Sequence, residues 1–430
     1  RIIIFILIKI DSTIKSPVRS LDRGFGSFSG FQAGLPVLNY LLPRVSTLSA
    51  TQISLPRRGG TGKMRLFGFI TGGTDPYLPL QTAGWLRRSI ATSCRAVLLP
   101  RFGGPEVLEL CPDVPVPDLK PKDVLVRTRA VSVNPLDTRI RAGYGRSIFE
   151  PLLPIILGRD ISGEVAAVGS SVRMFGLGQE VFGALHPTAV RGTYADYAIL
   201  SEDELALKPA SLTHVEASCI AFAALTAWRA LKSTAGITKG HAVLVIGGGG
   251  AVGFAGVQLA VAAGCHVSTT CGRESIERLL AAGAEQAVDY TSEGLESLIS
   301  GKFDAVLDTI GALGTERLGI NFLKRGGHYM TLQGEAGSFA DRYGLLIGIP
   351  MATAMLVKKQ IEYRCSHGIA YWWTYMRADG EGLEVIRRLA EAGKMRQPVE
   401  KTFPFTQVRE AHAAKDKRHV IGKAVLDFEC

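Results

Sequence analysis

The segment His241–Arg273 reads HAVLVIGGGGAVGFAGVQLAVAAGCHVSTTCGR. Within it, Val243–Ile246 is a short, branched, apolar run of the kind found in a strand buried on both faces. Gly247–Gly250 interrupt this run, and Ala251–Ala263 is then apolar over a length that suits a buried helix rather than a strand. Cys265–Thr270 is again rich in β-branched residues. The order of strand, glycine turn, helix and strand predicts a βαβ unit.

The turn of this unit carries the spacing GxGxxG at Gly248, Gly250 and Gly253. The early glycines permit a tight reversal, Gly250 lets the backbone approach a pyrophosphate, and Gly253 lets the helix pack closely on the strand. The helix that starts at Ala251 and Val252 offers free N–H groups and a partial positive charge to the phosphates. Because both strands and the helix accompany the motif, we predict a dinucleotide site rather than a purely structural glycine-rich turn.

The end of the second strand of this unit indicates which dinucleotide binds. An NAD site places an acidic residue there, about 20 residues past the glycines, to bind the ribose 2′-OH. Ser268–Arg273 reads STTCGR, with no carboxylate before Glu274. Hydroxyl groups such as that of Thr270, together with the guanidinium of Arg273, suit a 2′-phosphate instead. We therefore predict NADPH, and the alternative is that Arg273 is only a solvated residue at a helix start.

The positive charge of the chain is confined to its first part. Residues 1–92 contain 12 Lys and Arg against three acids, a net charge of +9, whereas the rest of the chain has 37 basic and 36 acidic residues. The body is therefore nearly neutral, which argues against a nucleic-acid partner. Residues 1–93 are rich in Arg, Ser, Gly and Leu, and we expect an organellar transit segment or a disordered leader there. The alternatives are a disordered tail that carries no targeting signal and a true start of the protein at Met64.

Cysteine usage argues against a disulfide-bonded or zinc-binding protein, and hydropathy argues against a transmembrane helix. The seven cysteines are scattered, form no CxxC pair and show no zinc-ligand spacing, so we interpret them as free thiols in a reducing compartment. No run approaches the roughly 18 apolar residues of a transmembrane helix.

The rest of the chain divides into a β-rich part and an alternating part. Six strands are predicted before the βαβ unit, at Ala96–Leu99, Val107–Leu110, Asp123–Ala130, Asp160–Val168, Glu180–Phe182 and Tyr194–Leu200. A helical pattern at Ser211–Lys232 bridges the two parts. Strands predicted at Ala287–Asp289, Phe303–Leu307 and Gly327–Leu332 alternate with helices and therefore predict an α/β fold with a doubly wound parallel sheet. A last helix over Leu383–Ala390 and a strand at Gly422–Phe428 complete the chain.

Several short motifs occur in the order seen in one known superfamily. They are Val133–Asp137 (VNPLD), Leu157–Gly163 (LGRDISG), Gly192–Ala195 (GTYA), Ala224–Ala227 (ALTA) and the pair Gly422 and Lys423. From about Arg95 to Phe428 the chain resembles the zinc-free quinone oxidoreductase branch of the medium-chain dehydrogenase/reductases. The stretches Gly143–Gly145, Tyr371–Met376 and Gly393–Phe405 resemble, more narrowly, a mitochondrial subgroup of that branch.

The resemblance implies a domain order. It implies a GroES-like catalytic domain over residues 94–218, a Rossmann NADPH-binding domain over residues 219–366, and a return to the catalytic domain over residues 367–430. Zinc-dependent members place a thiolate where this chain has Asn134, and a His-Glu pair where it has Arg159 and Asp160. Neither Asn134 nor Arg159 is a useful zinc ligand, and Val181–Gly192 lacks the cysteines of a structural zinc lobe. We therefore predict no metal.

The resemblance places three candidate catalytic residues beside the nicotinamide: Asn134, Asp137 and Tyr144. Asn134 would donate a hydrogen bond to the acceptor carbonyl, and Tyr144 would supply the proton. The alternative for Asp137 is a buried partner of backbone N–H groups.

Six further residues are predicted to contact the cofactor. Some follow strands of the nucleotide sheet, where such folds line the cofactor cleft, and the rest are implied by the resemblance. They are Thr226, Tyr290, Asp308, Thr309, Gln333 and Lys423. The alternative for Asp308, Thr309 and Gln333 is an ordinary strand-end polar role, and for Lys423 a surface strand lysine.

These observations lead to one main hypothesis and two alternatives. The main one is an NADPH-dependent, zinc-independent reductase of quinones or other α,β-unsaturated carbonyls in mitochondria, in the matrix, with a link to ubiquinone metabolism or respiratory-chain maintenance. The alternatives are a cofactor-binding assembly protein with little turnover and an enoyl-thioester reductase. The resemblance also implies a homodimer formed through edge strands and allows mitochondrial protein partners.

Overall fold

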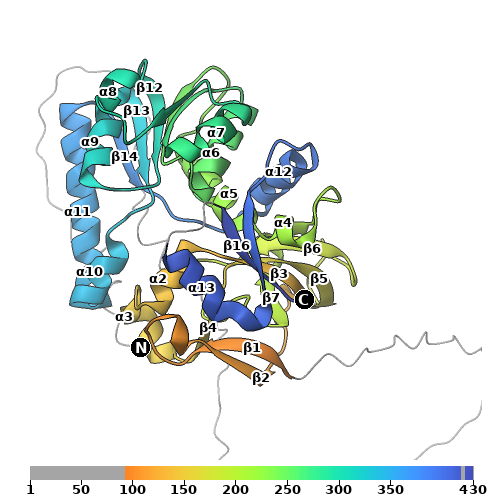
Figure 1. The fold of residues 1–430 in the computed structure, drawn as a ribbon. Helices are drawn as coiled ribbons and strands as arrows, with labels where there is room; N and C mark the ends of the chain where they lie inside the picture. Colours follow the sequence, from red (N-terminus) through yellow and green to blue (C-terminus); the bar gives the residue numbers. More distant parts are fainter. Residues whose placement is uncertain (1–92, 418–421, 430) are drawn as a thin grey trace, which may run out of the picture. The chain divides into compact units, whose positions relative to one another are not determined.

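The computed structural model describes residues 93–417 and 422–429, all within a compact unit that spans Leu66–Cys430 (Figure 1). The predicted leader, apart from Ser93, lies outside the described residues. The described chain forms three sheets, one of six parallel strands and two in a β-rich domain. No helix in this part of the chain is long and apolar enough to cross a bilayer.

The β-rich domain is built on a seven-stranded sheet with the order β15-β16-β3-β5-β6-β8, in which β7 pairs with β3. A smaller sheet of order β2-β1-β4 packs beside it. The strands of these two sheets are β1 (Ser93–Leu99), β2 (Glu109–Pro115), β3 (Asp123–Val133), β4 (Ile155–Ile156), β5 (Asp160–Val168), β6 (Glu180–Ala184), β7 (Tyr197–Ser201), β8 (Leu205–Leu207), β15 (Val399–Pro404) and β16 (Lys423–Asp427). The helices of this domain are α2 (Pro135–Arg141), α3 (Arg146–Phe149), α4 (His214–Ala217) and α13 (Val408–Asp416).

The nucleotide domain is a doubly wound sheet with the order β11-β10-β9-β12-β13-β14, and every neighbouring pair in it is parallel. Numbered from its first strand, this is the Rossmann order 3-2-1-4-5-6. Its strands are β9 (Ala242–Ile246), β10 (His266–Cys271), β11 (Gln286–Asp289), β12 (Phe303–Asp308), β13 (Leu323–Thr331) and β14 (Ala370–Trp373). Its helices are α5 (Ala221–Trp228), α6 (Ala251–Ala262), α7 (Ile276–Ala281), α8 (Leu295–Leu298), α9 (Leu313–Phe322), α10 (Ala336–Tyr343) and α11 (Leu345–Ser366). Helix α12 (Gly380–Glu391) lies on the return of the chain to the β-rich domain.

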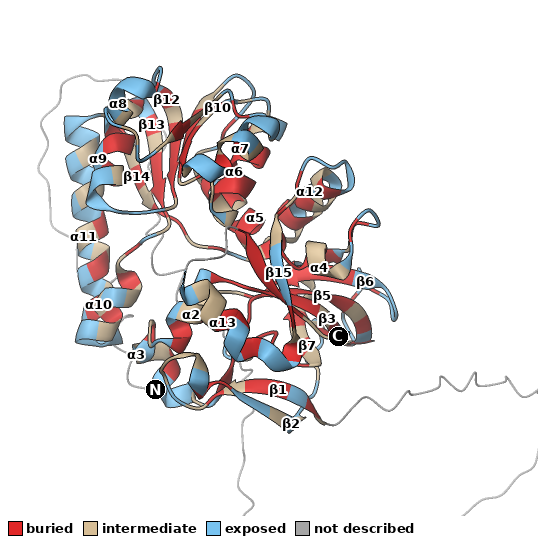
Figure 2. Ribbon diagram, in the orientation of Figure 1, coloured by how far each residue is buried: buried red, intermediate tan, exposed pale blue. Residues whose placement is uncertain are grey.

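The central strand β9 shows why this sheet forms. Val243, Leu244 and Val245 are fully buried, as expected for a strand covered by helices on both faces. Helix α6 buries most of its residues as well, which explains why its sequence is apolar without a polar stripe. Figure 2 shows the buried residues along the strands of both large sheets, so the helices lie outside the sheet cores.

Three predicted elements differ from the structure. The strand predicted at Val107–Leu110 begins only at Glu109 and runs on to Pro115 as β2, because a 3-10 turn with Pro105 at its first position occupies Pro105–Val107. The strand predicted at Tyr194–Leu200 begins only at Tyr197. The single helix predicted at Ser211–Lys232 is α4, α5 and a following π-helical segment.

Several elements were not predicted, and α11 and β14 are two whose sequences show why. Helix α11 is apolar along much of its length and contains Gly348 and Pro350, so it shows no amphipathic period. Strand β14 is only four residues long, and it belongs to the six-stranded sheet although it lies beyond residue 366, where the nucleotide domain was expected to end. The chain thus returns to the β-rich domain after Trp373.

Candidate active site

The glycine turn between β9 and α6 is shaped by three positions at which a larger residue would be strained or would clash. Gly247 has φ +85°, in the left-handed region. A Cβ on Gly253 would lie 2.2 Å from the carbonyl oxygen of Gly247, so helix and turn are in direct backbone contact there. A Cβ on Gly248 would lie 2.1 Å from Oγ1 of Thr269. The fold itself therefore requires these glycines.

Gly250 differs from its neighbours because nothing in the protein crowds it. Its φ is −77°, and a Cβ there would meet only the Gly247 oxygen, at 3.6 Å. Gly250 is the N-cap of α6, and no side chain caps this helix start. The open cradle that results has room for a phosphate against backbone N–H groups, so these residues fit a dinucleotide.

The residues predicted to select the cofactor meet at the ends of β10 and β11. Thr270 is buried, and its hydroxyl oxygen accepts a hydrogen bond from the Gly247 amide at 3.3 Å. Arg273 is exposed in a 3-10 turn that follows β10, and its charge helps to lower the pKa of Asp289. Tyr290 is 63% exposed, and its amide bonds the carbonyl of Cys271. The structure thus brings the three predicted residues to one edge of the sheet.

The sequence reasoning missed a second arginine beside the glycine turn. Nη2 of Arg278 on α7 donates to the carbonyl of Gly249 at 3.0 Å and to Oγ of Ser275 at 3.2 Å. The same guanidinium lies over the ring of Phe254, 4.9 Å from its centroid. Its place in the sequence could have indicated this role, because Arg278 lies on the helix that follows Arg273.

Two of the predicted strand-end residues hold the backbone of the cleft. Asp308 is fully buried and accepts hydrogen bonds from the amides of Ile310 and Gly311 and from the hydroxyls of Thr315 and Tyr329, at 2.6–2.9 Å. Oγ1 of Thr309 donates to the carbonyls of Ile246 and Gly247. Both side chains therefore fix the loops of the nucleotide site, whatever further contact they make.

The β-rich domain reaches the nucleotide domain through Arg139 on α2. Its Nη1 donates to Oε1 of Gln333, just beyond β13, at 3.2 Å. The Arg139 guanidinium also stacks on the ring of Tyr144, 4.1 Å from its centroid. Gln333 and Tyr144, both predicted site residues, are thus joined by an arginine that the sequence reasoning did not select.

Tyr144 and Tyr375 stand next to each other in this region. Burial raises the pKa of both hydroxyls above the ordinary value of a tyrosine, and each tyrosine is close enough to Arg139 for the guanidinium charge to oppose that rise. The Tyr375 hydroxyl is buried and has no hydrogen-bond partner within the described residues. Opposite Tyr144, the carboxylate of Asp341 on α10 accepts from the amides of Gly145 at 2.7 Å and Ser147 at 3.0 Å.

Lys423 is the centre of a buried polar cluster that also contains Ser132, Asn134 and Asp160. Its Nζ donates to Oδ1 of Asn134 at 2.6 Å, to Oδ2 of Asp160 at 2.9 Å and to Oγ of Ser132 at 3.0 Å. Lys423 is 0% exposed, so the alternative of a surface strand lysine is wrong. Its three N–H donors are all in use, which leaves none for a cofactor phosphate or a substrate.

Asp160 connects this cluster to the nucleotide domain. Its Oδ2 also accepts from the side-chain amide of Asn134 at 2.8 Å, and its Oδ1 accepts from the amide of Phe222, on α5, at 2.7 Å. On the same helix, the hydroxyl of Thr226 donates to the carbonyl of Phe222. Asn134 keeps one N–H of its side chain beyond the bond to Asp160.

Asp137 is also fully buried, and it accepts from backbone amides. Its carboxylate bonds the amide of Asn134 at 2.8 Å and that of Gly158 at 3.3 Å. Burial raises its pKa to about 6, against the opposing charge of Arg159. The Arg159 guanidinium donates to the carbonyls of Gly158 and Pro187, and its Nη2 is buried without a partner. These contacts agree with the alternative interpretation of Asp137 as a partner of backbone N–H groups.

A metal site is not evident in this region. In residues 93–417 and 422–429, no three His, Cys, Asp or Glu side chains gather closely enough to hold a metal ion. At the positions where zinc enzymes place ligands, Asn134 and Asp160 bond each other and Lys423 instead. Metal-free chemistry stays a prediction.

Comparisons with known proteins identify the family. Residues 120–210 match the alcohol dehydrogenase GroES-like domain, and residues 282–426 match a family described as zinc-binding dehydrogenase. The Mus musculus protein named NAD(P)H oxidoreductase RTN4IP1, mitochondrial, is 34% identical over 362 residues, which cover 78% of this chain and 91% of the relative. This chain belongs to the medium-chain dehydrogenase/reductase family. The resemblance seen in the motifs, including that to a mitochondrial subgroup, is confirmed.

Two further members of the family show how far the likeness extends. An Arabidopsis thaliana protein named NADPH-dependent alkenal/one oxidoreductase, chloroplastic, is 29% identical over 79% of this chain and 80% of its own length. The solved quinone oxidoreductase of Coxiella burnetii superposes with a TM-score of 0.66 at 29% identity, and covers 78% of this chain and 99% of its own. The medium-chain dehydrogenase/reductases share the GroES-like and Rossmann domains seen here, so the predicted α/β fold class is confirmed.

Proposed function

We propose that this medium-chain dehydrogenase/reductase uses NADPH to reduce a quinone or another α,β-unsaturated carbonyl without a metal. The observation that carries the proposal is the glycine turn, in which Gly250 leaves an open cradle at the start of α6 while Gly248 and Gly253 are closely packed. A structural turn would not need an unobstructed glycine at the helix N-terminus. The relatives named as NAD(P)H oxidoreductases support the same class of cofactor.

The preference for NADPH rests on the charges around the end of β10. Arg273 is exposed there, and the adjacent Tyr290 offers an exposed ring. A guanidinium binds a phosphate in a bidentate manner, whereas a ribose 2′-OH calls for a carboxylate. Arg278, tied to the carbonyl of Gly249, adds a second positive charge beside the turn.

In this mechanism the cofactor supplies a hydride, and the protein orients the acceptor and supplies a proton. Burial raises the pKa of Tyr144, so its hydroxyl carries a proton at neutral pH. The Arg139 guanidinium on the Tyr144 ring opposes that rise and would stabilise the phenolate left after proton transfer. Asn134, held by Lys423 and Asp160, has one remaining N–H with which to bind the acceptor oxygen.

Three finer parts of the proposal concern the cellular setting. We place the protein in the mitochondrial matrix, because relatives such as the Mus musculus NAD(P)H oxidoreductase RTN4IP1 are named mitochondrial and the basic leader is typical of a transit segment. A quinone substrate in that compartment would connect the enzyme to ubiquinone metabolism or to maintenance of the respiratory chain. A homodimer through the edge of the nucleotide sheet and mitochondrial protein partners belong to the same proposal.

The test is a titration of the full chain with NADPH and NADH, followed by NADPH oxidation with a panel of quinones and enones in the presence of EDTA. We expect NADPH to bind and at least one acceptor to be reduced. Tyr144→Phe should reduce kcat by about 10²-fold with little change in NADPH affinity. Tyr343→Phe, at an exposed tyrosine on α10, is the matched control and should turn over normally. Binding without reduction of any acceptor would favour a scaffold protein, and turnover of Tyr144→Phe at the wild-type rate would remove Tyr144 as proton donor.

A further inference from the structure

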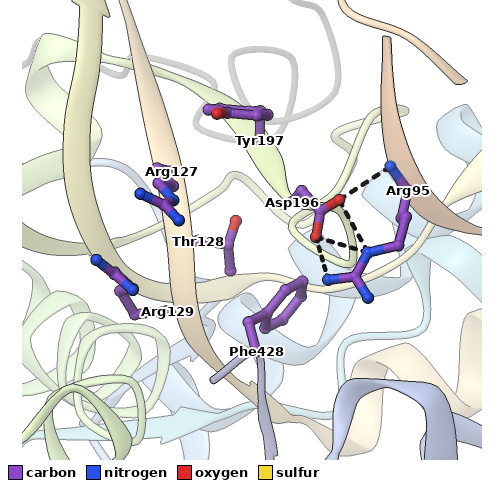
Figure 3. Close-up of a pocket in the computed structure, with 7 residues that line it drawn as sticks. All are labelled: Arg95, Arg127, Thr128, Arg129, Asp196, Tyr197 and Phe428. Atoms are coloured by element: carbon purple, nitrogen blue, oxygen red, sulfur yellow. Dashed lines mark hydrogen bonds and ion pairs between the residues drawn. The ribbon is translucent and has the colours of Figure 1, made fainter. Parts of the chain in front are cut away.

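The β-rich domain contains a pocket of about 230 Å³ at the middle of β3, lined by none of the residues of the glycine turn (Figure 3). Its lining comes from β1, β3, β7, the residue before β7 and the residue after β16. The lining residues are Arg95, Arg127, Thr128, Arg129, Asp196, Tyr197 and Phe428. No residue predicted for the cofactor or for catalysis is among them.

A bulge in β3 brings consecutive residues of that strand to the pocket. The register of β3 against β5 shifts between Thr128 and Ala130, and Arg127 is the last residue of β3 that pairs with β7. Beyond that point the amide of Thr128 donates to the carbonyl of Asp196. Such a bulge re-aims side chains that would otherwise alternate between the two faces of the sheet.

The carboxylates in and around the pocket are already paired. Both oxygens of Asp196 accept hydrogen bonds from Arg95, from its guanidinium at 2.9–3.3 Å and from its amide at 3.0 Å. Arg129 is held by Glu164 and Glu429. These two arginines are therefore largely neutralised, and the acceptors beside them are used.

The groups with unused hydrogen-bonding capacity are donors. Arg127 pairs with β5 and β7 through its backbone, but its side chain is exposed and makes no hydrogen bond or ion pair to any described residue. Thr128 is 3% exposed, and its hydroxyl has no partner although it is buried. In Figure 3 this hydroxyl points into the space bounded by Arg127, Tyr197 and Asp196. A ligand that satisfies this set must supply acceptors rather than donors.

We propose that this pocket binds a small oxyanion of the phosphate type. The Arg127 fork suits bidentate contact with two oxygens of a phosphate, and the Thr128 hydroxyl would donate to a third. The volume admits a phosphate group but not a dinucleotide, whose cradle is at Gly250. The pocket is thus a second anion site, distinct from the one that selects NADPH.

Strands β3 and β16 connect the pocket to the polar cluster around Lys423. Strand β3 continues from Arg127 to Ser132, whose hydroxyl bonds Nζ of Lys423. The next residues of β16, Ala424–Asp427, pair with β3, and Val425 lies opposite Ser132. At the other end of this ribbon the amide of Phe428 bonds the carbonyl of Arg129. Both ends of β16 therefore contact a charged site.

The test measures the thermal midpoint of the full chain against inorganic phosphate at constant ionic strength, with NADPH saturating so that the cofactor phosphate sites are filled. We expect a saturable rise in Tm for the wild type. Arg127→Gln should weaken phosphate about tenfold. Arg101→Gln, an exposed arginine of the same domain outside the pocket, should behave as the wild type.

A second measurement distinguishes the source of the phosphate group. Co-sedimentation with phosphatidylcholine vesicles containing phosphatidic acid, against pure phosphatidylcholine, tests a phosphate carried on a lipid. Vesicle binding lost in Arg127→Gln with no response to free phosphate would assign the same chemistry to a lipid headgroup. A phosphate response that is equal in the wild type and Arg127→Gln, or no response in either measurement, would overturn the proposal. The Arg101→Gln comparison holds even if NADPH fails to bind.

Discussion

The glycine turn of the nucleotide domain and the Lys423 cluster of the β-rich domain form opposite sides of the proposed active site. At the turn, Gly250 is uncrowded and the helix start has no side-chain cap, so its backbone donors are available to a ligand. In the cluster, Lys423, Asp160 and Asn134 are buried and bond one another, which leaves one side-chain N–H of Asn134 unused.

This difference teaches how to separate ligand-binding residues from positioning residues among polar groups near a site. A group whose hydrogen-bonding capacity is unused is available to a ligand, whereas a group whose partners are all in the protein fixes geometry. By this criterion we propose that Gly250 and Arg273 contact the cofactor. Lys423, Asp137 and Asp308 position the loops.

The largest expected effect breaks the buried cluster. Lys423→Met leaves the Asp160 carboxylate buried without its counter-charge, and we expect a loss of about 3–5 kcal/mol in the free energy of unfolding. Urea unfolding followed by circular dichroism would measure it. The control is Lys401→Met, at an exposed lysine on the adjacent strand β15, which should change stability by less than about 0.5 kcal/mol. A similarly small loss for Lys423→Met would mean that the cluster is not the support described here.

The next effect separates two glycines of one motif. Gly253→Ala places a Cβ 2.2 Å from a carbonyl oxygen and should destabilise the protein by about 1–3 kcal/mol. Gly250→Ala meets nothing closer than 3.6 Å and should unfold like the wild type. Its NADPH affinity should nevertheless fall at least tenfold, because the Cβ enters the phosphate cradle. Normal NADPH binding by Gly250→Ala would contradict the assignment of that cradle.

A third prediction uses the pH dependence of stability to test whether the fold keeps the buried His412 neutral. His412 is fully buried between Arg141 and the hydroxyl of Tyr194, and burial with the Arg141 charge lowers its pKa to about 3. The folded state therefore favours neutral His412, and this contribution to stability is complete above about pH 6.5 and is lost as the pH falls toward 3.

The measurement compares the pH dependence of unfolding in two proteins. Between pH 7.5 and 4.5 the wild type should lose about 2–3 kcal/mol more than His412→Gln, which has no titrating imidazole. The slope is the readout, since the substitution changes stability at every pH. Parallel curves for the two proteins would show that His412 is not held neutral by the fold.

The nucleotide domain could be predicted from the sequence more fully than the catalytic side. The βαβ unit is local, and its glycines, helix and strands lie within one segment, so periodicity and spacing predict it. Helix α11 was not predicted because its apolar residues show no helical period, and β14 was not predicted because four residues carry little pattern. Arg139 escaped for another reason: its contacts with Gln333 and Tyr144 depend on how two domains meet, which no local pattern encodes.

The roles of the polar residues were harder to predict than their location. The motif around Asn134 predicts catalytic residues there, and that stays a prediction. The sequence could not show that Lys423, 289 positions further along the chain, donates to Oδ1 of the Asn134 side chain. Nor could it show whether Lys423 was exposed. Burial is a property of the folded assembly, and it decides between a ligand contact and a support.

The smallest change, and the most direct test of the central claim, is a titration of the full chain with NADPH and with NADH, in the wild type and in Arg273→Ala. We expect the wild type to bind NADPH at least tenfold more tightly than NADH. Arg273→Ala should lose about tenfold in NADPH affinity, near 1.4 kcal/mol, with NADH affinity unchanged. Equal losses for both nucleotides, or tighter binding of NADH by the wild type, would contradict the account.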